Sequence, residues 1–177
     1  MIPRDLNEWT LERLDSILRL RLDENTRIEF KQDFTTTKAG RQRLQRTCCA
    51  FANSDGGFLI YGICDDRSLF VDDRLVGLPP ATDFAASFCN YPNRCVPQID
   101  WDYKRLKPLA NGNAIYVAYV PKSTCPPHVV ANDVNGFDFL TRGMGTNDYM
   151  TFDQIRAAFQ QSRNVVQRLN ALALSLS

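Results

Sequence analysis

The chain has 177 residues, of which 44% are hydrophobic and 23% are charged, and its 21 basic and 20 acidic side chains leave a formal net charge of +1. This length and composition predict one globular domain. The balanced charge excludes a nucleic-acid binder that works through overall basicity, so such a role requires an uneven charge distribution. The start resembles no signal peptide, and no apolar run approaches the length of a membrane-spanning helix. We therefore expect a cytoplasmic protein without membrane association.

The cysteines are expected to be free. There are six of them, but the chain has a single histidine and no Cys-x-x-Cys pair. A structural zinc site needs clustered cysteine and histidine ligands, and this pattern does not supply them. Cys48, Cys49 and Cys64 lie in apolar runs, where a free cysteine behaves as a small hydrophobic residue.

The first half of the chain predicts helices at residues 7–22 and 41–54 and strands at residues 28–34 and 58–64. Asn7 is the expected N-cap of the first helix. Gly56 and Gly57 end the second helix, because glycine accepts the left-handed cap conformation. The run after them is continuously apolar and predicts a central strand.

The second half predicts a helix at residues 83–89 and strands at 99–106, 114–120 and 137–141. The strands at 99–106 and 114–120 are expected to pair around an Asn-Gly-Asn turn. Residues 143–148 are read as a loop that contains glycine. Thr151 and Gln154 fit a capping box at the start of the last helix. Together the elements predict an α/β or α+β fold with a mixed sheet flanked by helices and followed by a C-terminal helix.

The last helix carries apolar residues at alternating steps of three and four, namely Phe152, Ile155, Phe159, Ser162, Val166, Leu169, Ala173 and Leu176. Two interpretations remain open. The helix packs on its own domain, or its half beyond Ser162 forms the seam of a dimer. We divide the chain into a domain at residues 1–161 and a helical extension at residues 162–177.

Three acidic residues are candidates for a metal site. Glu29 lies on a predicted strand, Asp65 follows the next strand, and Glu24 can join them if the chain bends between Glu24 and Glu29. Carboxylate oxygens suit Mg²⁺ or Mn²⁺, especially when a phosphate supplies the other ligands. The alternative is that all three are surface charges or partners in ion pairs.

Basic residues are placed where a phosphate could bind. Arg41, Arg43 and Arg46 oppose the dipole in the first half of a predicted helix, and an anion there would offset that unfavourable placement. The alternative is a solvated face. Lys31 either pairs with Glu29 or holds a phosphate, and Arg142 either forms a salt bridge or meets a phosphate.

Three further polar residues are more easily explained by structure than by function. Asn53 and Ser54 lie beside the glycines that end a helix, and we expect them to satisfy backbone groups there, with contact to substrate as the alternative. His128 lies among prolines and is expected to be packed or at the surface rather than to act as a general base.

The stretches Glu24-x4-Glu29-Phe30-Lys31, Ala50-Phe-Ala-Asn-Ser-x-Gly-Gly57 and Gly62-Ile-x-Asp65 resemble the Schlafen AlbA_2 family. The resemblance continues through Val120-Pro-x-Ser123, Pro127-His-Val129 and Phe139-x-x-Arg142, and covers roughly residues 10–160. The family was formerly described as a divergent ATPase. No Gly-x4-Gly-Lys-Ser/Thr motif supports that description in this chain.

The resemblance implies nucleic-acid binding, and it implies that Glu24, Glu29 and Asp65 bind Mg²⁺ or Mn²⁺ and cleave RNA. The expected function is a metal-dependent endoribonuclease acting on structured RNA such as tRNA. Phosphate contacts are expected from basic residues, namely Lys31, Lys38, Arg41, Arg43, Arg46 and Arg142. The alternatives are a non-catalytic DNA- or RNA-binding regulatory module and a scaffold that recruits a partner through its helix. Animal members carry two such lobes, so a single lobe predicts a homodimer or an assembly with a related chain.

Overall fold

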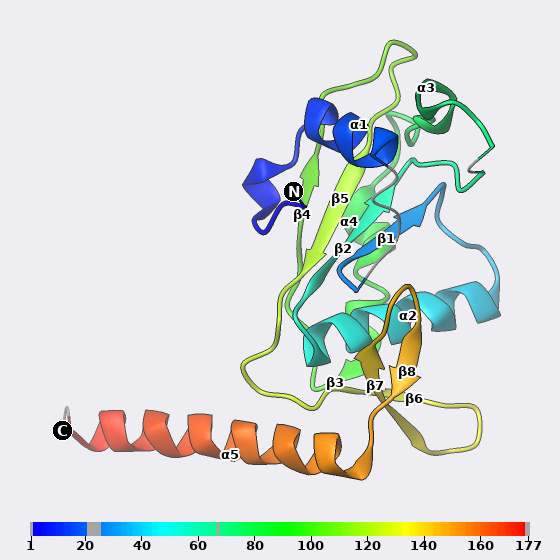
Figure 1. Cartoon of the computed structure of the whole chain (residues 1–177). Coiled ribbons are helices and arrows are strands. Elements are labelled where there is room, and N and C mark those ends of the chain that lie inside the picture. Colours follow the sequence, from blue (N-terminus) through cyan, green and yellow to red (C-terminus); the bar gives the residue numbers. More distant parts are fainter. Residues whose placement is uncertain (1, 21–25, 67, 176–177) are drawn as a thin grey trace.

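The computed structural model describes residues 2–20, 26–66 and 68–175 (Figure 1). The central sheet has four strands in the order β1 (Ile28–Lys31), β2 (Gly57–Tyr61), β5 (Tyr116–Val120) and β4 (Asp102–Arg105). β1 is parallel to β2, whereas β2 with β5 and β5 with β4 are antiparallel. This confirms the mixed sheet and the pairing of β4 with β5.

The two faces of the central sheet carry separate hydrophobic cores. Along β2, Phe58 and Ile60 pack with α1 (Leu11–Arg19), while Leu59 and Tyr61 pack with α2 (Lys38–Asn53) and α4 (Phe84–Phe88). Successive side chains of a strand point to opposite faces, so one continuously apolar strand serves both cores. The expected central strand is therefore confirmed.

A second sheet packs on the far side of α2. It contains β3 (Cys95–Val96), β6 (Val129–Ala131), β7 (Phe137–Arg142) and β8 (Asn147–Tyr149), all antiparallel. Figure 1 shows α2 running between this sheet and the central one, and α2 contacts both β6 and β7. The prediction of a loop at residues 143–148 was wrong in part, because β8 returns against β7 and forms a hairpin.

The helix boundaries differ from the sequence prediction at the first helix. A short 3₁₀ turn, η1 (Leu6–Glu8), precedes α1, and Thr10 rather than Asn7 caps α1 by accepting a hydrogen bond from the Arg13 amide. A threonine hydroxyl can satisfy one of the free amides of a helix start in this way. The shorter elements that the sequence did not predict are α3 (Val71–Arg74) and η2 (Pro92–Arg94), besides β3 and β6.

The last helix, α5 (Phe152–Ser175), is continuous through residue 162, and much of it extends past the rest of the molecule (Figure 1). Its capping box is confirmed, since Gln154 donates its amide to Thr151 Oγ1 and accepts from the Thr151 amide. Within the described part of the chain, no helix is both long and apolar enough to cross a membrane. The six cysteines are free, as expected.

Candidate functional site

A pocket of about 600 Å³ lies where β1, α2 and the β7–β8 hairpin meet. We call it the first pocket. Its lining comes from six parts of the chain and includes Glu29, Lys31, Gln42, Arg43, Arg46, Asp65, Asn132, Asp133, Arg142 and Asn147. Because β1 and β2 are parallel, their carboxyl ends meet at one edge, where the Gly62 amide donates to the Lys31 carbonyl. This arrangement brings Asp65 to the same pocket as Glu29.

Glu29 occupies the base of the first pocket and binds two cations. Its Oε1 accepts from Lys31 Nζ at 2.7 Å, and its Oε2 accepts from Arg142 Nη2 at 2.6 Å. The Arg142 side chain is 1% exposed and that of Lys31 is 26% exposed. For both cations the structure therefore shows the ion pair that the sequence allowed, and Lys31 is the more accessible of the two.

Arg142 is held by further contacts. Its Nη1 donates to Asn147 Oδ1 at 2.9 Å, and Asn147 in turn donates to Thr47 Oγ1 on α2. The guanidinium also lies over the Phe51 ring, with Cζ 4.9 Å from the ring centroid. A buried arginine needs this many partners because its desolvation is costly. Arg142 thus joins β7, β8, α2 and β1 under the first pocket.

Arg46 forms a second ion pair on the wall of the first pocket. Its Nη1 donates to Asp138, which is 5% exposed and also accepts from Asn132, and its Nη2 donates to Tyr149 Oη at 3.0 Å. The Arg46 side chain remains 31% exposed. A charged group so placed can keep its structural partner and still present part of its guanidinium to a ligand.

Arg43 and Asp65 line the first pocket and are both exposed. Among the described residues, Arg43 makes no ion pair. Glu24 lies outside the residues that the structure describes, so its position relative to Glu29 and Asp65 stays a prediction. No group of three histidine, cysteine or acidic residues within the described ranges is arranged to hold a metal ion.

The other predicted cations lie on the far side of α2. Lys38 and Arg41 line a second pocket of about 660 Å³, which also includes Phe34, Tyr91 and Arg94. We call it the second pocket. Lys38 Nζ binds Asp133 Oδ1 at 3.1 Å, and Gln42 donates to the same oxygen. The hydrogen bond from Lys38, and after it the one from Gln42, lowers the pKa of Asp133 below its usual value, so the carboxylate is ionised at neutral pH.

Asn53, Ser54 and His128 have structural partners, in line with the sequence interpretation. Asn53 donates to the backbone carbonyls of His128 and Leu140 and accepts from the His128 amide. Ser54 Oγ accepts from the Arg142 amide. The His128 ring is buried and has its two nitrogens 2.7 Å from the Pro97 carbonyl and from a serine hydroxyl. Their contacts fasten the end of α2 to the second sheet.

The match to a family model decides the identity of this fold. The model, described as Schlafen, AlbA_2, matches residues 24–151, which is well over half of the chain. The chain belongs to the Schlafen AlbA_2 family. Membership indicates a nucleic-acid-binding domain, and it places the first pocket and the network of Glu29 and Arg142 within the matched residues.

Two similar proteins are much longer than this Schlafen AlbA_2 domain. An uncharacterized ATP-binding protein, UU034, of Ureaplasma parvum serovar 3 (strain ATCC 700970) is 41% identical over 157 residues, covering 75% of this chain and 41% of that protein. The crystal structure of the DIP2311 protein from Corynebacterium diphtheriae is 16% identical with a TM-score of 0.49, covering 89% of this chain and 28% of the other. The chain thus spans less than half the length of either protein.

Several residues of the site escaped the sequence interpretation, among them Asp138, Asn147 and Thr47. One signal was available. Asp138, Leu140 and Arg142 alternate along β7 on its buried face. Two opposite charges on the apolar face of a strand indicate buried ion pairs, because an unpaired buried charge is too costly. The partners on α2 could not be deduced, since nothing in the sequence places the second sheet against α2.

Proposed function

We propose that this domain is a cytoplasmic, metal-dependent endoribonuclease that cleaves structured RNA such as tRNA, with the first pocket as its centre. The observation that supports the proposal most strongly is that Glu29, Asp65, Arg43 and Arg46 all line one pocket. Carboxylates and cations on a shared concave surface are what phosphodiester cleavage requires, because the phosphate needs neutralising charge and the reaction needs hard oxygen ligands.

The cations of the first pocket would hold the phosphate backbone. Arg43 is exposed, and the Arg46 side chain is 31% exposed, so both can meet a phosphate without breaking the fold. Lys38 and Arg41 lie just across α2 and would meet neighbouring phosphates. Such contacts fix affinity and register rather than sequence choice. Arg142 would act as a positioning residue that fixes the carboxylate of Glu29.

Glu24, Glu29 and Asp65 would hold Mg²⁺ or Mn²⁺. Their oxygen donors fit such an ion, provided that Lys31 releases Oε1 of Glu29. Lys31 is the cation that can move, since it is partly exposed whereas Arg142 is buried. When bound, the metal would polarise the scissile phosphate and activate water. A Lys31 side chain displaced in this way could turn to a phosphate oxygen.

The test is cleavage of bulk tRNA with Mn²⁺ or Mg²⁺ and with a chelator. Native protein is compared with Asp65→Asn, whose side chain is exposed, with Glu29→Gln, and with Asp102→Asn on exposed β4 as the matched control. We expect metal-dependent cutting that falls by about 100-fold or more in both site variants and is unchanged in the control. Cutting that survives in Asp65→Asn, or that ignores the chelator, contradicts the proposal.

One observation favours the non-catalytic alternative, a DNA- or RNA-binding regulatory module. Glu29 is already neutralised by two cations, which is the expected state of a structural carboxylate. A binding module should keep or increase its affinity for nucleic acid when Asp65 becomes Asn, because repulsion of phosphate falls. Retained salt-dependent binding without any cleavage by native protein would support this alternative.

The name of the Ureaplasma relative concerns ATP, so ATP belongs in these assays as a competitor. The phosphates of a nucleotide and of RNA would be attracted by the same cations. Competition at micromolar ATP would direct attention to a free nucleotide as the ligand, whereas competition only at millimolar ATP would reflect general phosphate binding.

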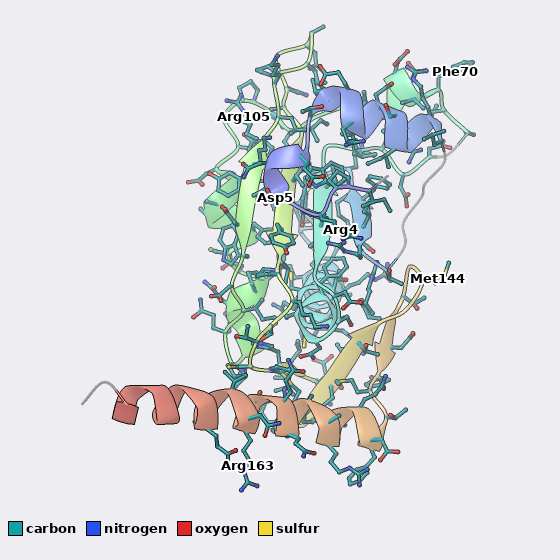
Figure 2. The ribbon with its side chains drawn as sticks, turned by 60° about the vertical axis from the view of Figure 1, so that its left-hand side comes forward. Arg4, Asp5, Phe70, Arg105, Met144 and Arg163 are labelled. Carbon is teal, nitrogen blue, oxygen red and sulfur yellow. The ribbon has the colours of Figure 1, made fainter. Side chains whose placement is uncertain are left out.

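A homodimer, or an assembly with a related chain, is the proposed functional form. Phe152, Phe159 and Val166 are exposed along α5 at intervals of seven residues. Figure 2 shows Arg163, on the same helix, pointing away from the domain. An exposed apolar stripe at this spacing is typical of a helix that pairs with another. We propose that this stripe contacts the second chain, with Arg163 at its rim.

A further inference from the structure

The second pocket has the chemistry of a nucleotide site. Three basic residues, Lys38, Arg41 and Arg94, line it. No acidic residue occurs among the described residues that line it. Phe34, Tyr91 and Val130 give it an apolar wall, while Gln45 and Asn90 supply amides. Cations beside an aromatic wall suit a phosphate joined to a base, whereas a metal ion would be repelled.

The two pockets adjoin along the first turns of α2. Gln42, Val130 and Ala131 line both of them. On α2 the residues Ala39, Arg43 and Arg46 turn to the first pocket, while the neighbouring Lys38, Arg41 and Gln45 turn to the second. Successive helical residues differ by about 100°, so a ridge one residue wide separates the two faces. That ridge is Gln42.

Asp133 connects the two sides of the ridge through its side chain. Asp133, which lines the first pocket, accepts from Lys38 of the second pocket and from Gln42 on the ridge. The Lys38 and Asp133 side chains are 77% and 68% exposed. An ion pair this exposed contributes little and opens readily. The ion pair and the hydrogen bond to Asp133 that cross the path from one pocket to the other are therefore weak contacts at the surface.

We propose that the second pocket binds a nucleotide of the same single-stranded segment whose backbone occupies the first pocket. The proposal rests on the proposed function and extends it, since it defines the substrate as a strand that crosses α2. Arg94 and Arg41 would meet the phosphate, and the base would lie against the partly buried Phe34, behind which Tyr91 is buried. A rigid duplex would not deliver a base into the second pocket, so the unpaired part of a structured RNA is the substrate class.

The test uses fluorescence anisotropy with a labelled single-stranded RNA of 12 nucleotides, in chelator so that no cleavage occurs. Arg94→Gln probes the second pocket and Arg43→Gln probes the first; both side chains are exposed, and within the described residues neither forms an ion pair. Arg105→Gln is the matched control, because Arg105 is an exposed arginine on β4, well separated from α2 in Figure 2. ATP is titrated in parallel.

We expect Arg94→Gln to weaken binding of the strand roughly three- to tenfold and to lower the slope of log affinity against log salt by about 0.7, the value for one phosphate contact on a single strand. Arg43→Gln should weaken binding and lower the salt slope to a similar extent. The control, Arg105→Gln, should change neither quantity. If only Arg43→Gln loses affinity for RNA, the second pocket does not bind the strand, and the proposed function is unaffected. If neither variant loses affinity for RNA, both this proposal and the proposed function are contradicted. If Arg94→Gln weakens the binding of ATP but not the binding of RNA, the second pocket is a site for free nucleotide. The proposal that an RNA strand crosses α2 is then wrong.

Discussion

At the scale of single residues, Glu29 has an environment that is costly to build. Its carboxylate is largely buried and is shared between Arg142 and Lys31. Removing two or three charges from water is costly, and mutual attraction offsets that cost only when every hydrogen bond is made. Glu29 therefore serves the fold as well as the proposed site, and effects on activity must be separated from effects on stability.

Glu29→Gln is expected to lower the free energy of unfolding by about 3–5 kcal/mol, because it leaves Arg142 buried without its counter-charge. Urea denaturation measures the change. The double variant Glu29→Gln/Arg142→Met should lose less than the sum of the single variants, since it removes the stranded charge. Asp153→Asn, which breaks an exposed ion pair with Arg156 on α5, is the control and should be neutral. An equally neutral Glu29→Gln contradicts this account.

Asp133 is an acidic residue at the boundary between the two pockets. Asp133→Asn removes a negative charge beside the proposed path of the strand and releases Lys38 from its ion pair. We expect affinity for single-stranded RNA to rise by about three- to tenfold at low salt and the gain to fade as salt is raised. Anisotropy titrations at two salt concentrations measure it.

The control for Asp133→Asn is Asp55→Asn, which removes another exposed carboxylate from its pair with Lys122. That pair lines neither pocket. Unchanged or weaker binding in Asp133→Asn, or an equal gain in the control, means that no strand passes Asp133.

At the scale of elements, α2 and α5 use their faces differently. α2 is buried by both sheets along its second half and presents cations to two pockets along its first. α5 turns Ile155, Ala158 and Val165 toward the domain, and leaves its other apolar stripe exposed. The a/d pattern of the sequence thus divides between two faces. Packing on the domain is shown for the inner residues, and the dimer stays a proposal for the outer ones.

Val166→Glu is expected to raise the dissociation constant of the proposed dimer by roughly tenfold or more, because burying a charge in place of a valine costs more than 1.4 kcal/mol. Light scattering after size-exclusion chromatography, over a range of protein concentrations, measures the change. Gln160→Glu adds the same charge on another exposed side of α5 and should leave association unchanged. A native protein that is monomeric at every concentration tested contradicts the dimer.

At the scale of the whole molecule, the first pocket exists because two sheets pack on opposite sides of one helix. β1 and the segment after β2 bring the carboxylates, α2 brings the cations, and the β7–β8 hairpin closes the pocket with Arg142 and Asn147. Each contribution comes from a different layer. The second pocket arises from the same layering, since η2 and α4 cover the other side of α2.

The sequence by itself determined the elements whose signals are local. The apolar run of β2, the glycines that end α2, the pairing of β4 with β5 and the capping box of α5 all depend on residues close together in the chain, and all were predicted. Family membership was also readable from short motifs. The predicted start of α1 was wrong because Asn7 and Thr10 are both residue types that suit a cap, and local propensity does not distinguish them.

Only the tertiary structure decided which charges meet. Glu29 and Arg142 are 113 residues apart, and Arg46 and Asp138 are 92 apart. Ion pairs over such separations depend on how the second sheet docks against α2, and no periodicity or local propensity encodes that docking. The same docking divided the predicted cations between two pockets. The sequence determined which residues could bind a phosphate, and the packing of layers determined which of them remain available to do so.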